Sequence, residues 1–296
     1  MSFFRNLFGK KPKTVPDIKT APLTDEQLRS VTRQPVACRP PQLIVGSAQS
    51  SGMQRDHNED TLFTLSSVFS DGNIELPFGF LIVADGMGGH LHGEIASGVA
   101  VRAMSEYIVG KLYPSLMGLH SDPQNESIQE IMENGIKEAQ QAVLHRAPGG
   151  GTTLTAALII GEQVTLAHVG DSRAYFIYPD GRIQTMTQDH SLVKRLVELG
   201  QMTEQDAAIS NQRNVLYRAI GQNEPFRPDI STFLFPRPGY VMLCSDGLWG
   251  VVAEQEIFKS VTSSVNLSMA CSQLIEKANQ AGGPDNISAV LAHYLN

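Results

Sequence analysis

The chain has 296 residues, of which 42% are hydrophobic and 18% are charged, a composition typical of ordinary globular proteins. Its formal net charge of −7 is uneven: residues 1–40 hold eight basic and three acidic residues, and residues 41–296 hold 15 and 27. The acidic body argues against nucleic-acid binding, which calls for a basic face.

The cysteines and the apolar runs bear on the compartment. The three cysteines, Cys38, Cys244 and Cys271, are widely spaced, so they form neither a zinc-ligand pair nor a disulfide framework. The first residues lack a long apolar core and a small-residue cleavage site. No apolar run approaches the ~18 residues of a membrane span. We therefore expect a cytoplasmic protein.

Residues 1–41 are predicted to form a disordered, basic, proline-rich arm. The segment holds six prolines and no sustained periodicity, with one short helix expected near Asp25–Val31. Its first residues combine Phe3, Phe4, Leu7 and Phe8 with basic side chains. Two interpretations of residues 1–13 stay open, a floppy tail or a weak contact with a membrane surface or partner.

Residues 42–296 are predicted to form one folded domain. Strands are expected from Gln42 and from Thr61, and Asp71-Gly-Asn is a hairpin turn signal. The apolar run Phe78–Ala84 is typical of a strand that is buried on both faces. Helices are expected at Glu94–Val109 and Glu126–Ala147. The second has apolar residues at helical spacing at Ile128, Ile131, Met132, Ile136, Ala139 and Val143.

The second half of this domain begins with strands joined by short turns, which favours antiparallel pairing. These strands are expected at Leu154–Ile160, Val164–Val169, Ala174–Tyr178 and Arg182–Met186. Residues 189–220 are predicted to form an inserted subdomain, here called the flap, with a short helix at Ser191–Leu199. The remaining elements are a strand at Tyr240–Cys244, a helix at Asn266–Ala281 and a strand at Ile287–Tyr294. This order favours an α+β fold with antiparallel sheets between helical layers.

Three aspartates lie at the ends of predicted buried strands. Asp85 and Asp246 each end an apolar run and precede a glycine, and Asp285 opens the final strand. One Asp-Gly pair is usually an ordinary turn, but the repeated context suggests that the carboxylates meet at one end of the sheets. Asn58-Glu-Asp60 adds two further acids at the head of the first hairpin.

Carboxylates and carbonyl oxygens are the ligands that suit Mg²⁺ or Mn²⁺. Acids gathered without cations would repel one another, and two ions would relieve that repulsion and activate a water for attack at phosphorus. Arg55 lies three residues before Asn58, where its guanidinium can bind phosphate oxygens in a bidentate manner. The pattern therefore predicts phosphoester chemistry at a metal centre.

Seven motifs in this order resemble those of the PP2C (PPM) serine/threonine phosphatases, with the Asp-Gly-Met-Gly-Gly-His form of the bacterial branch. The match runs from about residue 43 to 295. The motifs are Arg55-x-x-Asn-Glu-Asp60, Ala84-Asp-Gly-Met-Gly-Gly-His90, Gly151-Thr-Thr, Val169-Gly-Asp-Ser-Arg173, Asp189-His190, Ser245-Asp-Gly247 and Asp285-Asn286.

The resemblance implies a PP2C-like β-sandwich of two antiparallel sheets flanked by helices, with two Mn²⁺ or Mg²⁺ ions at one edge. Asp85 would bridge both ions, Arg55 would bind the substrate phosphate, and a metal-activated water would hydrolyse phosphoserine or phosphothreonine without a phospho-enzyme. Glu59 and Asp60 would act directly or through water. The implied ligands are Glu59, Asp60, Asp85, Gly86, Asp246 and Asp285.

Two departures from the family pattern concern the proton donor and a third ion. Animal members have a histidine, proposed as the general acid, where this chain has Met87. His90 is the candidate acid or substrate contact, and a structural role for it stays open. The segment Arg146–Gly151, where bacterial members often have a third-metal aspartate, has no acid and does not favour a third metal site.

The expected partners are phosphoproteins, the targets of serine/threonine kinases in signalling, and we expect the enzyme to be a monomer. Two alternatives stay open at this point. The enzyme could be the dedicated phosphatase of one regulator, of the anti-sigma-factor-antagonist type. The same fold could also be a catalytically dead binding module.

Overall fold

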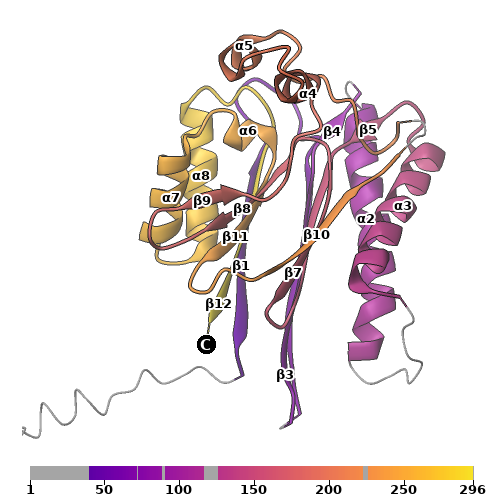
Figure 1. Cartoon of the computed structure of the whole chain (residues 1–296), viewed down its shortest axis with the longest axis vertical. Helices are drawn as coiled ribbons and strands as arrows, with labels where there is room; N and C mark the ends of the chain where they lie inside the picture. The colour runs from indigo at the N-terminus through magenta and orange to yellow at the C-terminus, as the bar shows by residue number, and fades with distance from the viewer. Residues whose placement is uncertain (1–39, 72, 89–90, 117–125, 223–225, 296) are drawn as a thin grey trace, which may run out of the picture. The chain divides into compact units, whose positions relative to one another are not determined.

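Two five-stranded antiparallel sheets lie face to face at the centre of the described chain (Figure 1). The computed structural model describes residues 40–71, 73–88, 91–116, 126–222 and 226–295. The first sheet has the order β1 (Gln42–Ser50), β12 (Ile287–Leu295), β11 (Tyr240–Cys244), β8 (Arg173–Ile177) and β9 (Ile183–Thr185). The second has the order β10 (Asp229–Leu234), β7 (Gln163–Val169), β6 (Leu154–Ile160), β3 (Glu75–Ala84) and β2 (Thr61–Ser70).

The inner strands are buried on both faces, as their apolar sequences require. In β3, Leu81 and Val83 point into the core between the two sheets, and Phe80 and Ile82 point toward the helices that cover the second sheet. Because successive side chains of a strand alternate between faces, a strand with two covered faces needs an unbroken apolar run. The predicted strand at Phe78–Ala84 is confirmed within a longer β3.

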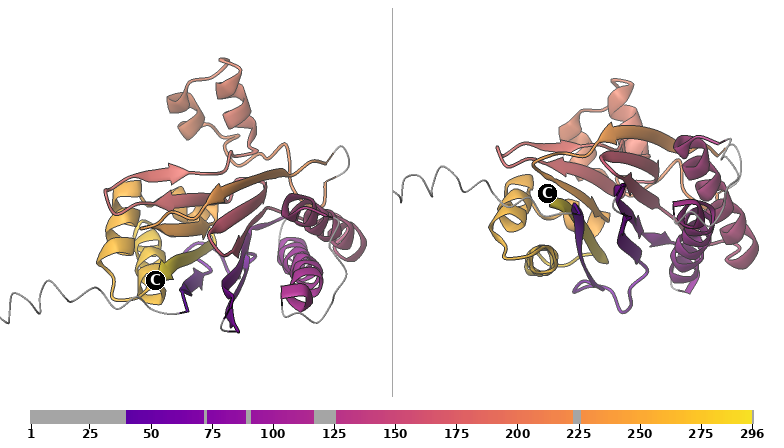
Figure 2. Two further views of the ribbon diagram at one scale, coloured as in Figure 1. Left: turned by 60° about the horizontal axis from the view of Figure 1, so that its bottom comes forward. Right: turned by 90° about the horizontal axis from the view of Figure 1, so that it is seen from below.

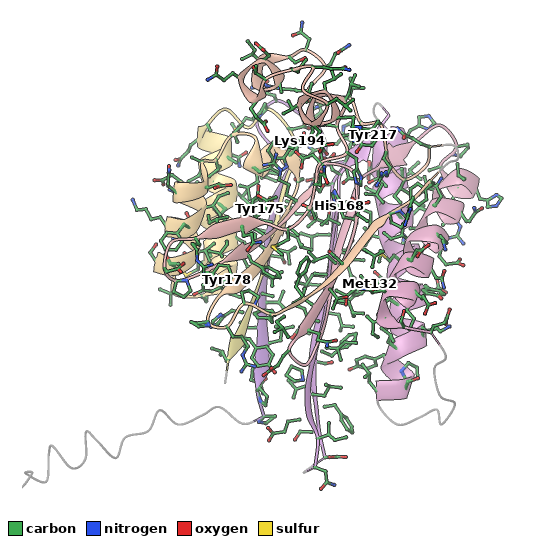
Figure 3. All side chains as sticks on the ribbon, viewed as in Figure 1. Met132, His168, Tyr175, Tyr178, Lys194 and Tyr217 are labelled. Carbon is green, nitrogen blue, oxygen red and sulfur yellow. The ribbon has the colours of Figure 1, made fainter. Side chains whose placement is uncertain are left out.

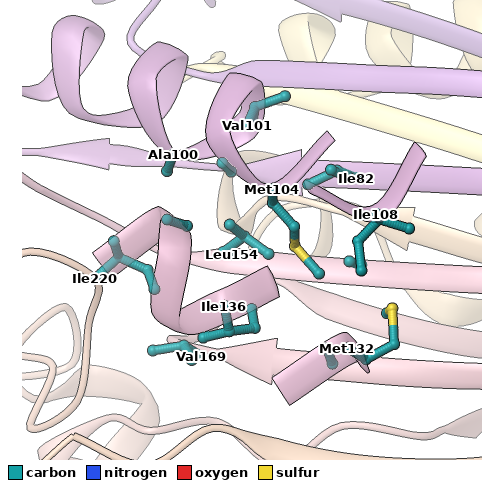
Figure 4. Close-up of a cluster of buried hydrophobic side chains, with 14 of the residues drawn as sticks. Ile82, Ala100, Val101, Met104, Ile108, Met132, Ile136, Leu154, Val169 and Ile220 are labelled. Atoms are coloured by element: carbon teal, nitrogen blue, oxygen red, sulfur yellow. The ribbon is translucent and has the colours of Figure 1, made fainter. Parts of the chain in front are cut away.

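Helical layers cover the outer face of each sheet (Figures 1 and 2). The second sheet is covered by α2 (Leu91–Leu116) and α3 (Ile128–Arg146), and the first by α7 (Glu254–Ser263) and α8 (Leu267–Gln280). Met104 and Ile108 of α2 pack with Met132 and Ile136 of α3 against the sheet (Figure 4). The predicted α+β arrangement of two antiparallel sheets between helical layers is confirmed.

Several elements differ from their predicted bounds. Helix α2 continues past the predicted end at Val109, and its last turn contains Pro114 and buries Leu112 against the sheet. Strand β10 was not predicted because it is an edge strand whose exposed and half-buried residues carry little apolar signal. Helix α7 was also missed. Among the described residues, no helix combines the length and the apolarity that crossing a membrane would take.

The flap stands at one end of the sheets, where α4 (Leu192–Glu198) and α5 (Glu204–Ile209) rise above α6 (Asp246–Trp249) (Figure 1). The short pair β4 (Gly86–Met87) and β5 (Gly151–Thr152) lies at this same end. Ser191 caps α4 through its side chain and forms an isolated bridge with Leu216. Thus both ends of the flap are fixed next to each other.

His168 is buried below the flap, in the interior of the second sheet (Figure 3). Its Nε2 lies 3.0 Å from the carbonyl oxygen of Gln188, and its Nδ1 lies 2.9 Å from Oγ1 of Thr155. A carbonyl only accepts, so Nε2 carries the proton and the neutral ring accepts at Nδ1. Burial, with a contribution from neighbouring His190, lowers the pKa of His168 to about 4.

This buried histidine should make stability depend on pH. The pKa of an unfolded histidine is about 6.5, and that of folded His168 is about 4. At pH values between these two, the unfolded chain binds a proton at this residue and the folded chain does not. The free energy of unfolding should therefore fall as the pH decreases, by up to about 1.4 kcal/mol per pH unit from this residue. Urea denaturation of the wild type and His168→Gln between pH 7 and 5 measures it. The stability difference between the two proteins should shrink toward pH 5, with His145→Gln, an exposed residue, as control; a constant difference would contradict the assignment.

Candidate metal centre

Carboxylates from several distant segments line one pocket of about 430 Å³ at the flap end of the sheets. The flap contributes Asn214 and Leu216 to the same pocket. Most of the residues that the sequence singled out are brought together here, namely Arg55, Glu59, Asp85, Gly86, Asp246 and Asp285. Asp60 lies behind this lining as a buried residue, and His90 lies outside the described residues.

Asp85 is held at the end of β3 by the Gly151-Thr-Thr segment. Its backbone N–H donates to Oγ1 of Thr153 at 2.9 Å, and its carbonyl oxygen accepts from the N–H of Thr153 and the hydroxyl of Thr152, both at 2.9 Å. The hydroxyl groups of Thr153 and buried Ser172 are 2.8 Å apart. These bonds fix the backbone of Asp85, which lines the pocket, and Ser172 is the buried hydrogen-bond partner of Thr153.

The glycines after Asp85 and Asp246 are required by close backbone contacts. A Cβ on Gly86 would lie 2.4 Å from the carbonyl oxygen of Gly93 and 2.6 Å from that of Glu59. A Cβ on Gly247 would lie 2.1 Å from the carbonyl oxygen of Asn286. Only glycine allows such an approach, so each Asp-Gly pair marks a place where two segments of the site touch.

Asn286 joins the end of the first sheet to the loop that carries Arg55 and Glu59. Its side chain accepts from the N–H of Glu59 at 2.8 Å and donates to the carbonyl oxygens of Ser51 and His57 at 2.9 and 2.8 Å. The preceding residue, Asp285, forms a 2.8 Å ion pair with Arg55, which is half exposed. This hydrogen bond raises the pKa of Arg55, so its guanidinium is charged and accessible to an anion.

Burial and mutual repulsion raise the pKa values of four carboxyl groups here. Burial is the main cause for each. The second cause is the negative charge of a neighbouring aspartate: Asp60 raises the pKa of Asp85, Asp285 that of Asp246, and Asp246 that of Asp171. The pKa of Asp60 rises to about 7, although hydroxyl groups of Ser288 and Ser245 donate to its Oδ2. The charge of Asp246 also contributes to raising the pKa of Asp85.

These residues fit a hard divalent cation. Oδ1 of Asp60 and Oδ1 of Asp246 are buried without a hydrogen-bond partner, and such orphaned oxygens are costly unless something compensates them. The donors are all carboxylate or carbonyl oxygens, the set that Mg²⁺ and Mn²⁺ prefer. Within the described ranges, no three His, Cys, Asp or Glu side chains already converge on one point.

Asp171 is the pocket residue that sequence reasoning missed. It is buried and faces Asp246, whose charge contributes to raising its pKa. The signal was present, because Asp171 follows the apolar strand at Val164–Val169 and a glycine, a context close to that of Asp85. Asp171 adds one more carboxylate to the lining of the pocket.

Comparison with known proteins gives concordant results. Residues 46–287 match the family Protein phosphatase 2C. The serine/threonine phosphatase stp of Listeria innocua is 36% identical over 246 residues, which are 81% of this chain and 91% of that protein. The S. agalactiae serine/threonine phosphatase superposes with a TM-score of 0.69 at 31% identity, over 85% of this chain and 99% of that one. The catalytic domain of PstP in complex with two manganese ions superposes with a TM-score of 0.65 at 28% identity, over 86% and 100%.

Replacing Gly247 tests the close contact that joins the two parts of the site. Gly247→Ala places a methyl group 2.1 Å from the Asn286 carbonyl oxygen, so the backbone must shift, and we expect a loss of about 2 kcal/mol or more in the free energy of unfolding. Gly110→Ala is the matched control, because this exposed α2 position has open space around its Cβ. It should be neutral or stabilise by up to about 1 kcal/mol. Equal effects in chemical denaturation would contradict the contact.

Proposed function

The chain belongs to the Protein phosphatase 2C family and is a metal-dependent protein serine/threonine phosphatase, and we propose that its pocket carboxylates hold two Mn²⁺ or Mg²⁺ ions. The observation that carries this proposal is the buried carboxylate cluster with its unpartnered oxygens, beside an accessible arginine. The manganese pair in the PstP complex supports it by similarity. Because the ligand set is intact, nothing favours a catalytically dead module.

The similarity to the family proposes a role for each pocket residue. Asp85, at the end of β3, and the carbonyl oxygen of Gly86 would help to hold the ions. Asp246 and Asp285 are proposed to hold them as well, and Glu59 to act through water. Asp60 lies behind the pocket and would orient the ligands from there. Asp171 is a further oxygen donor facing Asp246.

When bound, the ions activate a water for direct attack at phosphorus and stabilise the charge that develops on the phosphoryl oxygens. Arg55 would exchange part of its ion pair with Asp285 for the substrate phosphate, since its guanidinium is half exposed at the pocket wall. The flap residues Asn214 and Leu216 also line the pocket, and the peptide around the phosphorylated residue would lie against them. The substrates are phosphoproteins, as the activity itself requires.

Removing one ligand charge should abolish turnover with little effect on the fold. Asp85→Asn and Asp246→Asn should each lower kcat for a small phosphate ester in Mn²⁺ by a factor of about 100 or more, because a neutral amide binds a hard cation poorly. Asp180→Asn is the control, because Asp180 is an exposed carboxylate that is not part of the pocket lining. EDTA should inhibit the wild type, and added Mn²⁺ should restore it. Full activity of Asp246→Asn would refute the assigned centre.

Arg55 should act on substrate binding rather than on metal binding. Arg55→Ala should raise KM for a phosphopeptide about tenfold or more, since a charged hydrogen bond contributes about 1.5–3 kcal/mol. Arg55→Lys should recover part of the loss, because lysine keeps the charge without the bidentate geometry. Steady-state kinetics at saturating Mn²⁺ measures both. An unchanged KM in Arg55→Ala would contradict the phosphate-binding role.

A further inference from the structure

Arg173 lies at the centre of a tight set of contacts beside the metal pocket. Its Nε and Nη2 donate to the two carboxylate oxygens of Asp189 at 2.9 and 2.7 Å. Its guanidinium stacks over the ring of Trp249, with Cζ 3.6 Å from the ring centroid. Both partners of the ion pair are largely buried, with side-chain exposures of 24% for Arg173 and 9% for Asp189.

The partners of Arg173 connect it to two pocket carboxylates. Trp249 is the last residue of α6, the helix that begins with Asp246, and its indole N–H donates to the carbonyl oxygen of Asp171 at 3.0 Å. The same ring therefore touches the backbone of Asp171 and belongs to the single helical turn that carries Asp246. Trp249 therefore links the backbone of Asp171 to the helix that carries Asp246.

On its other side, Arg173 is fixed to the root of the flap. Asp189 precedes His190, whose backbone N–H donates to the carbonyl oxygen of Gly170 at 2.7 Å, and whose Nδ1 accepts from the N–H of Gly170 at 3.0 Å. The carbonyl oxygen of His190 accepts from the N–H of Tyr217, where the flap returns, at 2.9 Å. Residues 170–173 are thus bonded to the root of the flap at both of their ends, through Gly170 to His190 and through Arg173 to Asp189.

A buried ion pair of this kind adds little net stability, because the desolvation of two charges offsets their attraction, but it specifies one geometry. Bidentate pairing and stacking on an aromatic ring are the two features that lysine cannot reproduce. A second cavity of about 520 Å³ lies between the flap and α6 and shares Asp171 and Asp246 with the metal pocket. Arg173, Asp189 and Trp249 line it, so the pair sits between the flap and the carboxylates.

We propose that Arg173 and Trp249 are positioning residues that hold Asp171 and Asp246 in place for the metal ions by fixing them to the root of the flap. This role rests on the proposed metal centre and extends it. Neither side chain is a ligand. Asp189 at the flap root holds Arg173, and Arg173 in turn holds the ring of Trp249. Trp249 bonds the backbone of Asp171 and lies in the same helix as Asp246.

The first test measures metal binding directly. Arg173→Met keeps a long side chain but removes the ion pair, and the dissociation constant for Mn²⁺ from isothermal titration calorimetry should rise about tenfold, the size of effects seen when the partners of metal ligands are removed. Arg182→Met is the matched control, because Arg182 also pairs with an aspartate, Asp180 at 2.8 Å, and stacks on a tyrosine, Tyr178 at 4.2 Å, but at an exposed turn. Its Mn²⁺ affinity should change less than twofold.

The second test uses the fluorescence of Trp249, the one tryptophan of the chain. Binding of Mn²⁺ to the wild type should change its emission with the midpoint found by calorimetry, and Arg173→Met should shift that midpoint upward. Arg173→Lys should fall between the two, and Trp249→Phe, followed by calorimetry alone, should weaken Mn²⁺ binding as well. These milder variants keep the test open if Arg173→Met does not fold.

The possible outcomes distinguish failure of the proposed metal centre from failure of the positioning role. If the wild type binds no Mn²⁺ and hydrolyses no phosphate ester, the proposed metal centre fails and the positioning role fails with it. If the wild type binds Mn²⁺ and the Arg173 and Trp249 variants bind it equally well, the positioning role alone is overturned, even where thermal unfolding shows that these variants are less stable. A selective loss of Mn²⁺ affinity that is absent in Arg182→Met supports it.

Discussion

Repulsion among buried carboxylates is the physical constraint on which the rest of the site depends. Asp60, Asp85, Asp171 and Asp246 all have raised pKa values because burial strips them of water and places them near one another. Hydroxyl groups of Ser245 and Ser288 donate to Asp60 and relieve only part of this repulsion. Hard cations would relieve the remainder, so a cluster that lowers the stability of the bare protein becomes a source of metal affinity.

The sandwich makes this arrangement possible because its strand ends coincide. Asp85 ends an inner strand of the second sheet, while Asp246 and Asp285 flank two inner strands of the first. Rigid, fully buried strands deliver these residues to one place. The glycine after Asp85 allows close contact with the backbone of Glu59 and Gly93, and the glycine after Asp246 allows close contact with the backbone of Asn286. The flap adds Asn214 and Leu216 to the wall of the pocket.

The buried strands and most of the pocket acids could be predicted from the sequence, whereas an edge strand and the long-range hydrogen bonds could not. Long apolar runs such as the one that ends at Asp85 identify buried strands, and acids at their ends identify the pocket. Strand β10 gave no such signal because one of its sides is an exposed edge. The three-way bonding of the Asn286 side chain could not be predicted, because it depends on the carbonyl groups of a loop more than 200 residues earlier. Asp171 follows a glycine in a short turn between two strands, a position where an aspartate is usually an ordinary turn residue.

The place of β12 in the first sheet has a consequence for biosynthesis. This strand is the last in sequence, yet it lies between β1 and β11 and pairs with β1 along its whole length, from Gln42 opposite Leu295 to Ser50 opposite Ile287. A nascent chain on the ribosome can assemble the second sheet and its helices early, but the first sheet lacks a middle strand until residues 285–295 emerge. Asp285 and Asn286 arrive with that strand, so a chain that stops before residue 285 lacks part of the pocket lining.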